Sequence, residues 1–289
     1  MTLSGLKYFV TAAKHGNISR AAEELSVSQP SVSQAIKALE GEFGLPLISR
    51  ERTGFSLTEG GKELYLRAST LLSAAASLSA AMTEMGRGRL SVRVGIPPMI
   101  GNMLLDRILG ELRARYPELS VSFGEGGREE LISGLESGSL DMAFISHSEP
   151  LPEGYSSLPV GCEETVLAVS DKNPLSTRHS VTPEELADEP LALFGEGYFI
   201  TERVMKLFAE RGLTARVMHT STQLSAQLKL ISANVASGFL FRSIAKSREG
   251  IVAVSVEPPL FTDISLVWRS GGLETDGMKK FKELIGEKK

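Results

Sequence analysis

The residues best suited to chemistry lie between positions 29 and 37 of this 289-residue chain. Gln29, Ser31, Ser33, Gln34 and Lys37 carry small or amide-bearing groups that donate and accept hydrogen bonds, with a single cation among them. A solvent-exposed helix face more often carries Glu and Lys in alternation. Gln and Ser near the start of a helix suit contacts to base edges and phosphates in a DNA major groove. This pattern slightly favours DNA recognition over the alternative, a helix hairpin with a merely polar surface.

Two short helices around a tight turn must hold these side chains. Asn17 or Ser19 can cap the first helix. The turn lies at 26–28, and Ser28 can cap the second helix because its hydroxyl satisfies free backbone N–H groups. Pro30 falls in the first turn, where its missing N–H costs nothing. Apolar residues at helical spacing then define the buried face of the second helix, namely Val32, Ala35, Ile36, Leu39 and Phe43.

A helix over residues 3–14 and a hairpin over 47–57 complete the first predicted domain, which spans residues 1–58. Gly54 permits the hairpin turn. Arginines on a hairpin are often only solvated, but beside this helix pair we expect the hairpin to contact the sugar-phosphate backbone. The residues predicted to contact DNA are Ser28, Gln29, Pro30, Ser31, Ser33, Gln34, Lys37, Arg50, Arg52 and Thr53.

Residues 59–86 form one long predicted helix that Thr58 caps. Its apolar side chains alternate between spacings of four and three residues, which is a heptad pattern. This period favours pairing with a second copy of the helix, because packing within one chain would shift the period toward 3.6 residues. We expect a homodimer, with a long Ala-rich helix packed within its own chain as the alternative. The predicted dimerisation residues are Leu64, Ala68, Leu71, Ala75, Leu78 and Met82.

From residue 90 the pattern changes to alternating strands and helices, after a predicted hinge at 86–89. Apolar strands separated by helices imply parallel-sheet units with right-handed crossovers. Two such sets predict a two-lobed α/β domain over 90–289, with lobe I at about 90–160 and 265–289 and lobe II at about 161–264. Strands are predicted over 90–94, 119–123, 142–145, 165–170, 216–219, 237–241 and 264–268. Helices are predicted over 99–116, 129–137, 198–211, 222–233 and 274–286.

Composition excludes several classes of function. The formal net charge is −4, and residues 1–62 hold seven Lys or Arg against six Asp or Glu, so the case for DNA depends on residue pattern rather than on bulk charge. The single cysteine, Cys162, excludes an intramolecular disulfide and a Cys-rich zinc site. We expect it to be a buried small hydrophobe, and a redox sensor would need an intermolecular partner.

Four histidines lie far apart without metal-ligand spacing, and no nucleophile-elbow or phosphate-loop motif occurs. We therefore expect neither an enzyme nor a bound metal or cofactor. The first residues lack a signal-peptide pattern, and the chain has no run of about 18 apolar residues. The sequence predicts a cytoplasmic protein without a membrane partner.

A larger set of residues, in register over some sixty positions, carries a family resemblance. The set is Leu6, Phe9, Ala12, Ser19, Ala21, Ala22, Leu25, Ser28 to Ser33, Ile36, Leu39, Glu40, Gly44, Leu47, Arg50 and Leu57 to Gly61. Residues 3–66 resemble the winged helix-turn-helix domain of LysR-type transcriptional regulators, and the layout of the remaining chain is similar to theirs.

This resemblance implies an all-α winged helix-turn-helix domain and a linker helix, followed by a two-lobed effector domain that is periplasmic-binding-protein-like. It implies a transcriptional regulator that binds double-stranded promoter DNA and a small-molecule effector, as a homodimer that assembles into a tetramer through its effector lobes. A solute-binding receptor without a transcriptional role is the alternative, and it would leave residues 17–58 unexplained.

The resemblance also implies an effector site at the loop after the first strand of the α/β domain, where the family often has Ser or Thr. Here the loop over 95–101 has no hydroxyl, and its two prolines could equally serve only to stiffen it. Arg128 opens a later helix where the family often has a hydroxyl, and its guanidinium could hold a carboxylate or could be a solvated rim residue. We therefore hypothesise an effector that is a carboxylate or other anion with an apolar part. The predicted effector contacts are Pro97, Pro98, Met99, Ile100, Arg128, Ser146, Phe199, Ile200 and Thr201.

Overall fold

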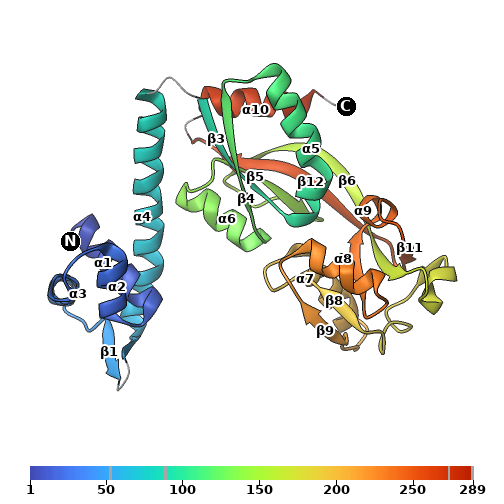
Figure 1. Cartoon of the computed structure of the whole chain (residues 1–289), viewed down its shortest axis with the longest axis horizontal. Coiled ribbons are helices and arrows are strands. Elements are labelled where there is room, and N and C mark those ends of the chain that lie inside the picture. Colours follow the sequence, from blue (N-terminus) through green and yellow to red (C-terminus); the bar gives the residue numbers. More distant parts are fainter. Residues whose placement is uncertain (52–53, 87–89, 273, 288–289) are drawn as a thin grey trace. The chain divides into compact units, whose positions relative to one another are not determined.

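The computed structural model describes residues 1–51, 54–86, 90–272 and 274–287. They form two compact units, the first of Met1–Thr83 and the second of Glu84–Glu136 and Leu140–Lys289 (Figure 1). Most of the predicted hinge, residues 87–89, lies outside the described residues.

The first unit confirms the predicted helices and hairpin. Three short helices precede a two-stranded antiparallel hairpin, in which Ile48 pairs with Leu57, and a long helix follows (Figure 1). The elements are α1 (Leu3–His15), α2 (Ile18–Leu25), α3 (Gln29–Phe43), β1 (Ile48–Glu51), β2 (Gly54–Leu57) and α4 (Glu59–Gly86).

Local side chains decide where these helices begin. The Asn17 carboxamide accepts hydrogen bonds from the backbone N–H groups of Ser19 and Arg20 at the start of α2. Ser28 caps α3 and Thr58 caps α4 in the same way, by accepting from the N–H groups of Ser31 and Gly61. Each cap satisfies N–H groups that have no partner inside the helix.

The core of the first unit lies between α1, α2, α3, the hairpin and the first turns of α4. Leu6, Phe9, Val32 and Ile36 are almost completely buried in it. Ala68 of α4 belongs to this core at 2% exposure, and Leu64 packs against it. The start of the predicted dimerisation face therefore packs within its own chain.

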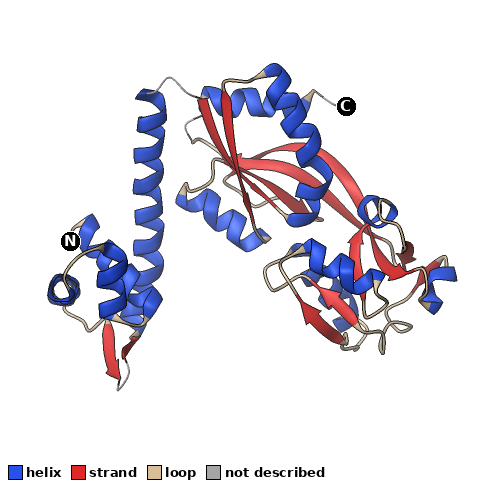
Figure 2. Cartoon of the chain, viewed as in Figure 1, coloured by secondary structure: helices blue, strands red, loops and turns tan. Residues whose placement is uncertain are grey.

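The second unit is built on one mixed sheet with the strand order β4-β3-β5-β12-β6-β10-β8-β9, where β11 pairs with β6 and with β7. Helices lie on both faces of the sheet (Figure 2). The strands are β3 (Leu90–Ile96), β4 (Leu119–Glu125), β5 (Met142–His147), β6 (Tyr155–Ser170), β7 (Ser180–Val181), β8 (Leu191–Leu193), β9 (Val217–Thr220), β10 (Ser237–Phe241), β11 (Ile251–Val256) and β12 (Leu260–Arg269). The helices are α5 (Pro98–Arg115), α6 (Arg128–Ser137), the 3-10 turn η1 (Pro174–Thr177), α7 (Phe199–Ala209), α8 (Leu224–Ser232), α9 (Arg242–Lys246) and α10 (Asp276–Gly286).

Two long strands correct the prediction of purely parallel units. β6 begins at Tyr155 rather than near residue 165, and β12 runs antiparallel to both β5 and β6. Both strands run from one half of the unit to the other (Figure 1). We call the half with β3, β4, β5, α5, α6 and α10 lobe I, and the half with β8, β9, β10, α7 and α8 lobe II. The predicted lobe boundaries near 160 and 264 therefore fall inside strands.

The first half of β6 escaped prediction because it contains Pro159, Gly161 and acidic residues, all of which weaken the strand pattern. Pairing with β12 holds this segment extended all the same. Four shorter elements, β7, β8, α9 and β11, also went unpredicted, as did η1. Each is too short to show a period of its own.

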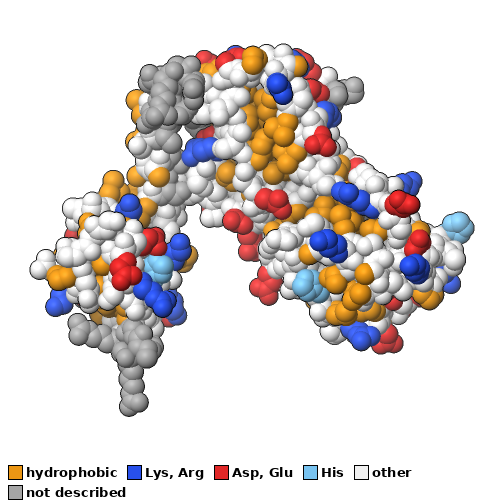
Figure 3. Space-filling model, viewed as in Figure 1, with side chains coloured by type: hydrophobic (Ala, Val, Ile, Leu, Met, Phe, Trp, Pro, Cys, Tyr) orange, Lys and Arg blue, Asp and Glu red, His pale blue; other side chains and the backbone are white. Residues whose placement is uncertain are grey.

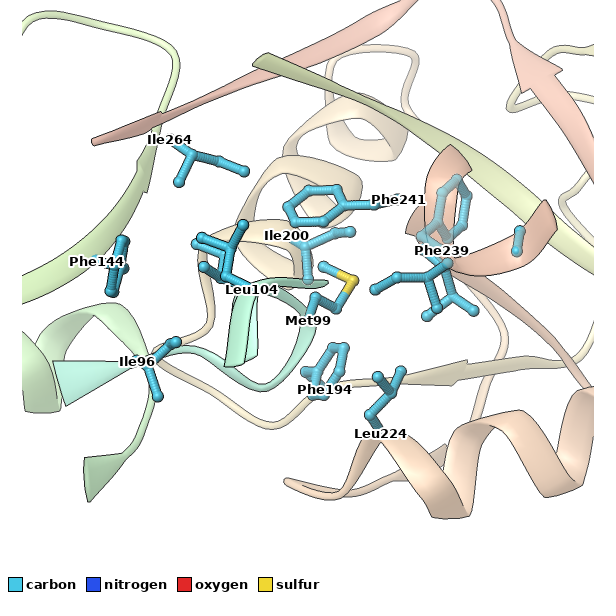
Figure 4. Packing of buried hydrophobic residues seen from close by; sticks show 14 of the residues in the cluster. Ile96, Met99, Leu104, Phe144, Phe194, Ile200, Leu224, Phe239, Phe241 and Ile264 are labelled. Carbon is cyan, nitrogen blue, oxygen red and sulfur yellow. The ribbon is translucent and has the colours of Figure 1, made fainter. Parts of the chain in front are cut away.

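The core of the second unit is continuous from lobe I to lobe II. It joins Ile100 and Phe144 of lobe I to Phe194, Ile200 and Phe241 of lobe II. Figure 4 shows Met99, from the start of α5, reaching between these lobe II side chains. The place where the lobes meet is therefore lined by apolar groups.

Candidate functional site

The α3 face predicted to contact DNA is exposed in the first unit. Gln29, Gln34 and Lys37 are exposed, whereas Val32 and Ile36, on the other side of the helix, are buried. Among the remaining predicted contacts, Ser28 and Pro30 are exposed, and Ser31 and Ser33 are partly buried. The face therefore offers amide groups, hydroxyls and one ammonium to a partner.

Two hydrogen-bond arrangements fix this helix. The Ser28 and Ser31 hydroxyls lie 2.7 Å apart at its first turn, so each hydroxyl is oriented by the other. At its other end, the Glu40 carboxylate accepts from the backbone N–H groups of Leu47 and Ile48, at 2.9 and 3.4 Å. Glu40 thereby ties α3 to the hairpin.

The hairpin residues predicted to contact the DNA backbone are only partly described. Arg50 lies in β1 opposite Phe55, but its side chain is outside the described part of the structure. Arg52 and Thr53 lie outside the described residues altogether. Blue and red side chains are interspersed on the visible face of the first unit (Figure 3), in keeping with its small predicted net charge.

Helix α4 keeps an exposed apolar face beyond the core of the first unit. Leu71, Leu78 and Met82 are 43%, 65% and 58% exposed, and Ala75 is partly exposed. These four residues continue the predicted heptad face. Leu64 and Ala68 do not, because they already pack inside the first unit.

The second unit has a cleft where lobe I meets lobe II, and eight of the nine predicted effector contacts line it. The cleft encloses about 440 Å³ of empty space, including its open mouth. Its predicted members are Pro97, Pro98, Met99, Ile100, Arg128, Ser146, Phe199 and Ile200. Thr201 is not among the lining residues, because its hydroxyl donates a hydrogen bond of 3.0 Å to the Phe194 carbonyl.

Four further residues of the cleft were missed by the sequence prediction. Ile145, Phe194, Tyr198 and Phe241 come from three different strands and from the residue before α7. The Phe194 and Tyr198 rings stack with their centroids 5.1 Å apart. Ile145 and Tyr198 directly adjoin predicted contacts, which is a usable signal, whereas Phe241 ends a strand that has no such neighbour.

The start of three helices meets this cleft. The lining residues include the first residues of α5, of α6 and of α7. The residues that precede α5 and α7, Pro97 and Tyr198, make no side-chain capping hydrogen bond. First-turn N–H groups have no intrahelical partner, and a helix start carries a partial positive charge. The backbone around the cleft therefore favours a negatively charged ligand.

Arg128 is half-buried and contacts the Phe199 ring, with its guanidinium carbon 5.5 Å from the ring centroid. Close approach of two backbones holds this pair together, because a side chain at Gly127 would lie 2.7 Å from the Gly197 carbonyl oxygen. Burial, together with the charges of Glu125 and Glu130, raises the pKa of the Tyr198 hydroxyl, so this group stays protonated at neutral pH.

Cys162 is exposed, which corrects the prediction that it is buried. It lies in the part of β6 that pairs with β12, opposite Asp263. Partial burial of its sulfur and the neighbouring Asp263 carboxylate raise the pKa of the Cys162 thiol. The thiol is therefore mainly protonated at neutral pH, and a protonated thiol is a poor nucleophile.

The histidines form separate contacts. His147 lies 2.9 Å from the Ser265 hydroxyl, and His15 pairs with Glu24. Across the described residues, no group of three or more His, Cys, Asp or Glu side chains could hold a metal ion. Within the same residues, none of the helices is both long and apolar enough to span a membrane.

Known proteins resemble the chain over almost its whole length. The probable hydrogen peroxide-inducible genes activator of Mycobacterium avium is 29% identical over 296 residues, which cover 99% of this chain and 94% of the relative. The DNA-binding transcriptional dual regulator OxyR of Escherichia coli is 28% identical over 281 residues, covering 94% and 90%.

A solved structure of CbnR, a LysR family transcriptional regulator, superimposes with a TM-score of 0.73 at 25% identity, covering 99% of this chain and 98% of that one. Full-length CbnR in complex with its target DNA gives 0.71 at 25% identity, covering 99% of each chain.

Two family descriptions account for both units. Residues 3–62 match the bacterial regulatory helix-turn-helix proteins of the lysR family. Residues 86–289 match the LysR substrate binding domain. The chain therefore belongs to the LysR family of bacterial transcriptional regulators.

Proposed function

We propose that this regulator reads a promoter operator through α3 and responds to a small molecule in the cleft between lobes I and II. It acts in the cytoplasm, where the promoter DNA is, and it is not an enzyme. Ligand in the cleft shifts the arrangement of the lobes or subunits and so changes how the winged helices meet DNA.

One observation carries the DNA-binding part of this proposal. Gln29, Gln34 and Lys37 are exposed on one face of α3, while buried residues and the Ser28 cap fix the orientation of the helix. An amide at such a position can form two hydrogen bonds with an adenine edge, and a lysine nearby can contact phosphate. The CbnR structure with its target DNA supports the same use of this fold.

The test begins with an operator selected from a random DNA library with the full-length protein. We expect Gln34→Ala to weaken binding to this operator by about 1–3 kcal/mol with little effect on random DNA. Lys37→Ala should weaken both and reduce the salt dependence of binding, because a phosphate contact carries no sequence information. Gel-shift titrations measure both effects. Equal losses on both DNAs for Gln34→Ala would demote Gln34 to a backbone contact.

We also propose that the chain is a homodimer through α4, with tetramer assembly through its effector lobes. Support comes from Leu71, Leu78 and Met82, which are apolar, exposed and spaced as a heptad seam. We expect Leu71→Asp to lower the mass of the assembly in analytical ultracentrifugation, because the change would bury an unpaired charge. Leu66→Asp is the matched control, since Leu66 is 63% exposed on the same helix but lies off the seam. Identical masses for both variants would remove the seam.

Peroxide sensing is the second candidate, since several relatives are hydrogen peroxide-inducible genes activators. A sensor that closes an intramolecular disulfide needs two cysteines, and this chain has only Cys162. The raised pKa of the Cys162 thiol also makes it slow to react with peroxide. We therefore expect operator binding by the purified protein to be unchanged by peroxide. A shift that disappears in Cys162→Ser would restore peroxide as the signal.

A further inference from the structure

The cleft between the lobes contains unpartnered hydrogen-bond donors and no negative group. Of its described lining residues, Arg128 is the one with a formal charge, and nine others are aliphatic, aromatic or proline side chains. Arg128 forms no ion pair or hydrogen bond with any residue that the structure describes, so its contact with the Phe199 ring is its main partner. A cation in an apolar cleft without a counter-charge favours an anionic ligand.

The contact with Phe199 leaves the guanidinium free to bind. A guanidinium that lies over a ring face is held by its flat side, and its N–H groups point outward from its edge. Those N–H groups match the two oxygens of a carboxylate through parallel hydrogen bonds. The ring therefore orients Arg128 without using its donors.

Ser146 supplies a second, independent sign of a missing ligand. Its side chain is 9% exposed, lines the cleft and has no hydrogen-bond partner among the described residues. A buried hydroxyl without a partner is costly, and a ligand oxygen would satisfy it. The protonated Tyr198 hydroxyl and the free N–H groups where α5 and α7 begin add donors around the same space.

We infer that the effector is an organic monocarboxylate whose carboxylate pairs with Arg128 and whose apolar body lies against Met99, Ile200 and Phe241. The inference rests on the proposed function of the cleft and specifies its ligand. One charged group in the lining matches one ligand charge. The remaining walls are apolar, which excludes a bare inorganic anion as the best ligand. Met99 already reaches between the lobe II side chains, so it is the residue that a ligand body contacts first (Figure 4).

The test uses the full-length protein in a buffer free of carboxylates. The probes are benzoate, phenylacetate and hexanoate, each with its neutral amide, and inorganic phosphate for comparison. We expect at least one carboxylate to bind in calorimetry, and its amide to bind about 10- to 100-fold more weakly. Arg128→Gln should remove this preference, and Arg128→Lys should keep only part of it because an ammonium lacks the planar fork.

Arg203→Gln is the matched control. Arg203 contacts the same Phe199 ring at 5.8 Å, but it donates to the Phe261 carbonyl at 2.6 Å and is not a lining residue of the cleft. Carboxylate affinity should change less than twofold in this variant. Circular dichroism confirms that each variant is folded, and Arg128→Lys replaces Arg128→Gln if the latter fails to fold.

Four outcomes would overturn the inference: equal affinity for acid and amide, equal affinity for phosphate, full affinity in Arg128→Gln, or no binding by any of the three acids at 10 mM, roughly the weak limit for a specific small ligand. Operator binding by the wild-type protein is measured separately. Loss of operator binding would count against the proposed function, whereas these four outcomes concern only the ligand class.

Discussion

In the first unit, the side chains proposed to read DNA come from one helix, whereas the cleft of the second unit draws on residues from Pro97 to Phe241. The polar contacts that hold the two regions differ in the same way. Caps such as Asn17 and Ser28 bond to N–H groups two or three residues away. In the second unit, Arg93 pairs with Asp141 and Arg242 with Glu164, across 48 and 78 residues of chain.

This difference teaches where each unit is vulnerable. A surface built on one capped helix depends on local contacts of about 1 kcal/mol each, so single polar changes weaken it gradually. A cleft assembled from distant segments depends on the packing and ion pairs that bring those segments together. Four variants would break or sharpen this comparison.

Phe9→Ala should have the largest effect. Phe9 is fully buried in the core of the first unit, and its truncation should cost about 3–5 kcal/mol of unfolding free energy. Differential scanning calorimetry should show a lower transition for the first unit and an unchanged one for the second, because their cores are separate clusters. Phe281→Ala, at an equally buried position of the second unit, is the mirror-image control. If both transitions moved together in either variant, the units would unfold as one.

Glu164→Gln should destabilise the second unit by about 1.5–3 kcal/mol at neutral pH. Hydrogen bonds from Arg242 hold the pKa of the Glu164 carboxyl below its usual value, so its ionised form is favoured in the folded state. A lowered carboxyl pKa contributes stability above the pKa of the unfolded chain, and this contribution is lost as the pH falls through the folded value.

The difference between wild type and Glu164→Gln should therefore be full at pH 7 and should vanish in strong acid. Urea unfolding at several pH values measures it. Glu153→Gln serves as control, because Glu153 is exposed and forms no ion pair within the described residues. A difference that stayed constant with pH would mean that the Glu164–Arg242 pair does not stabilise the fold through its charge.

Gln227→Leu should stabilise the second unit, by about 1–3 kcal/mol. Gln227 is fully buried in α8, and neither polar atom of its side chain has a partner among the described residues. Leucine has a similar volume and no polar group to desolvate. Thermal unfolding of this variant and of Gln223→Leu, at an exposed position beside the same helix, checks the effect. A destabilised Gln227→Leu would mean that the amide has a partner in solution.

Asn17→Ala should have the smallest effect, about 1 kcal/mol, because it removes one helix cap. The Asn17 carboxamide accepts two N–H groups at the start of α2, at 2.9 and 3.1 Å. Operator affinity should fall only slightly in gel shifts, since α3 keeps its own cap at Ser28. Asn17→Ser, which restores an acceptor, should recover most of the lost stability. A loss as large as that of Phe9→Ala would contradict the view that local contacts act gradually in this unit.

The sequence by itself determined the elements with strong local signals. The caps at Asn17, Ser28 and Thr58 and the 3.6-residue spacing of α3 act within a few residues, so no distant partner is needed to recognise them. Eight of nine predicted cleft residues line the cleft, because they lie where strands end and helices begin in a family with a known layout.

Only the tertiary structure decided the remaining features. Phe194 and Phe241 face the cleft because β8 and β10 lie side by side in the sheet, and strand order is not encoded in local spacing. The start of β6 is extended because β12 pairs with it, against its own weak strand pattern. Ala68 and Leu64 pack inside the first unit rather than on the exposed part of α4, although one heptad pattern runs through both. A periodic pattern marks which face is apolar, and the chain's own fold decides which partner covers it.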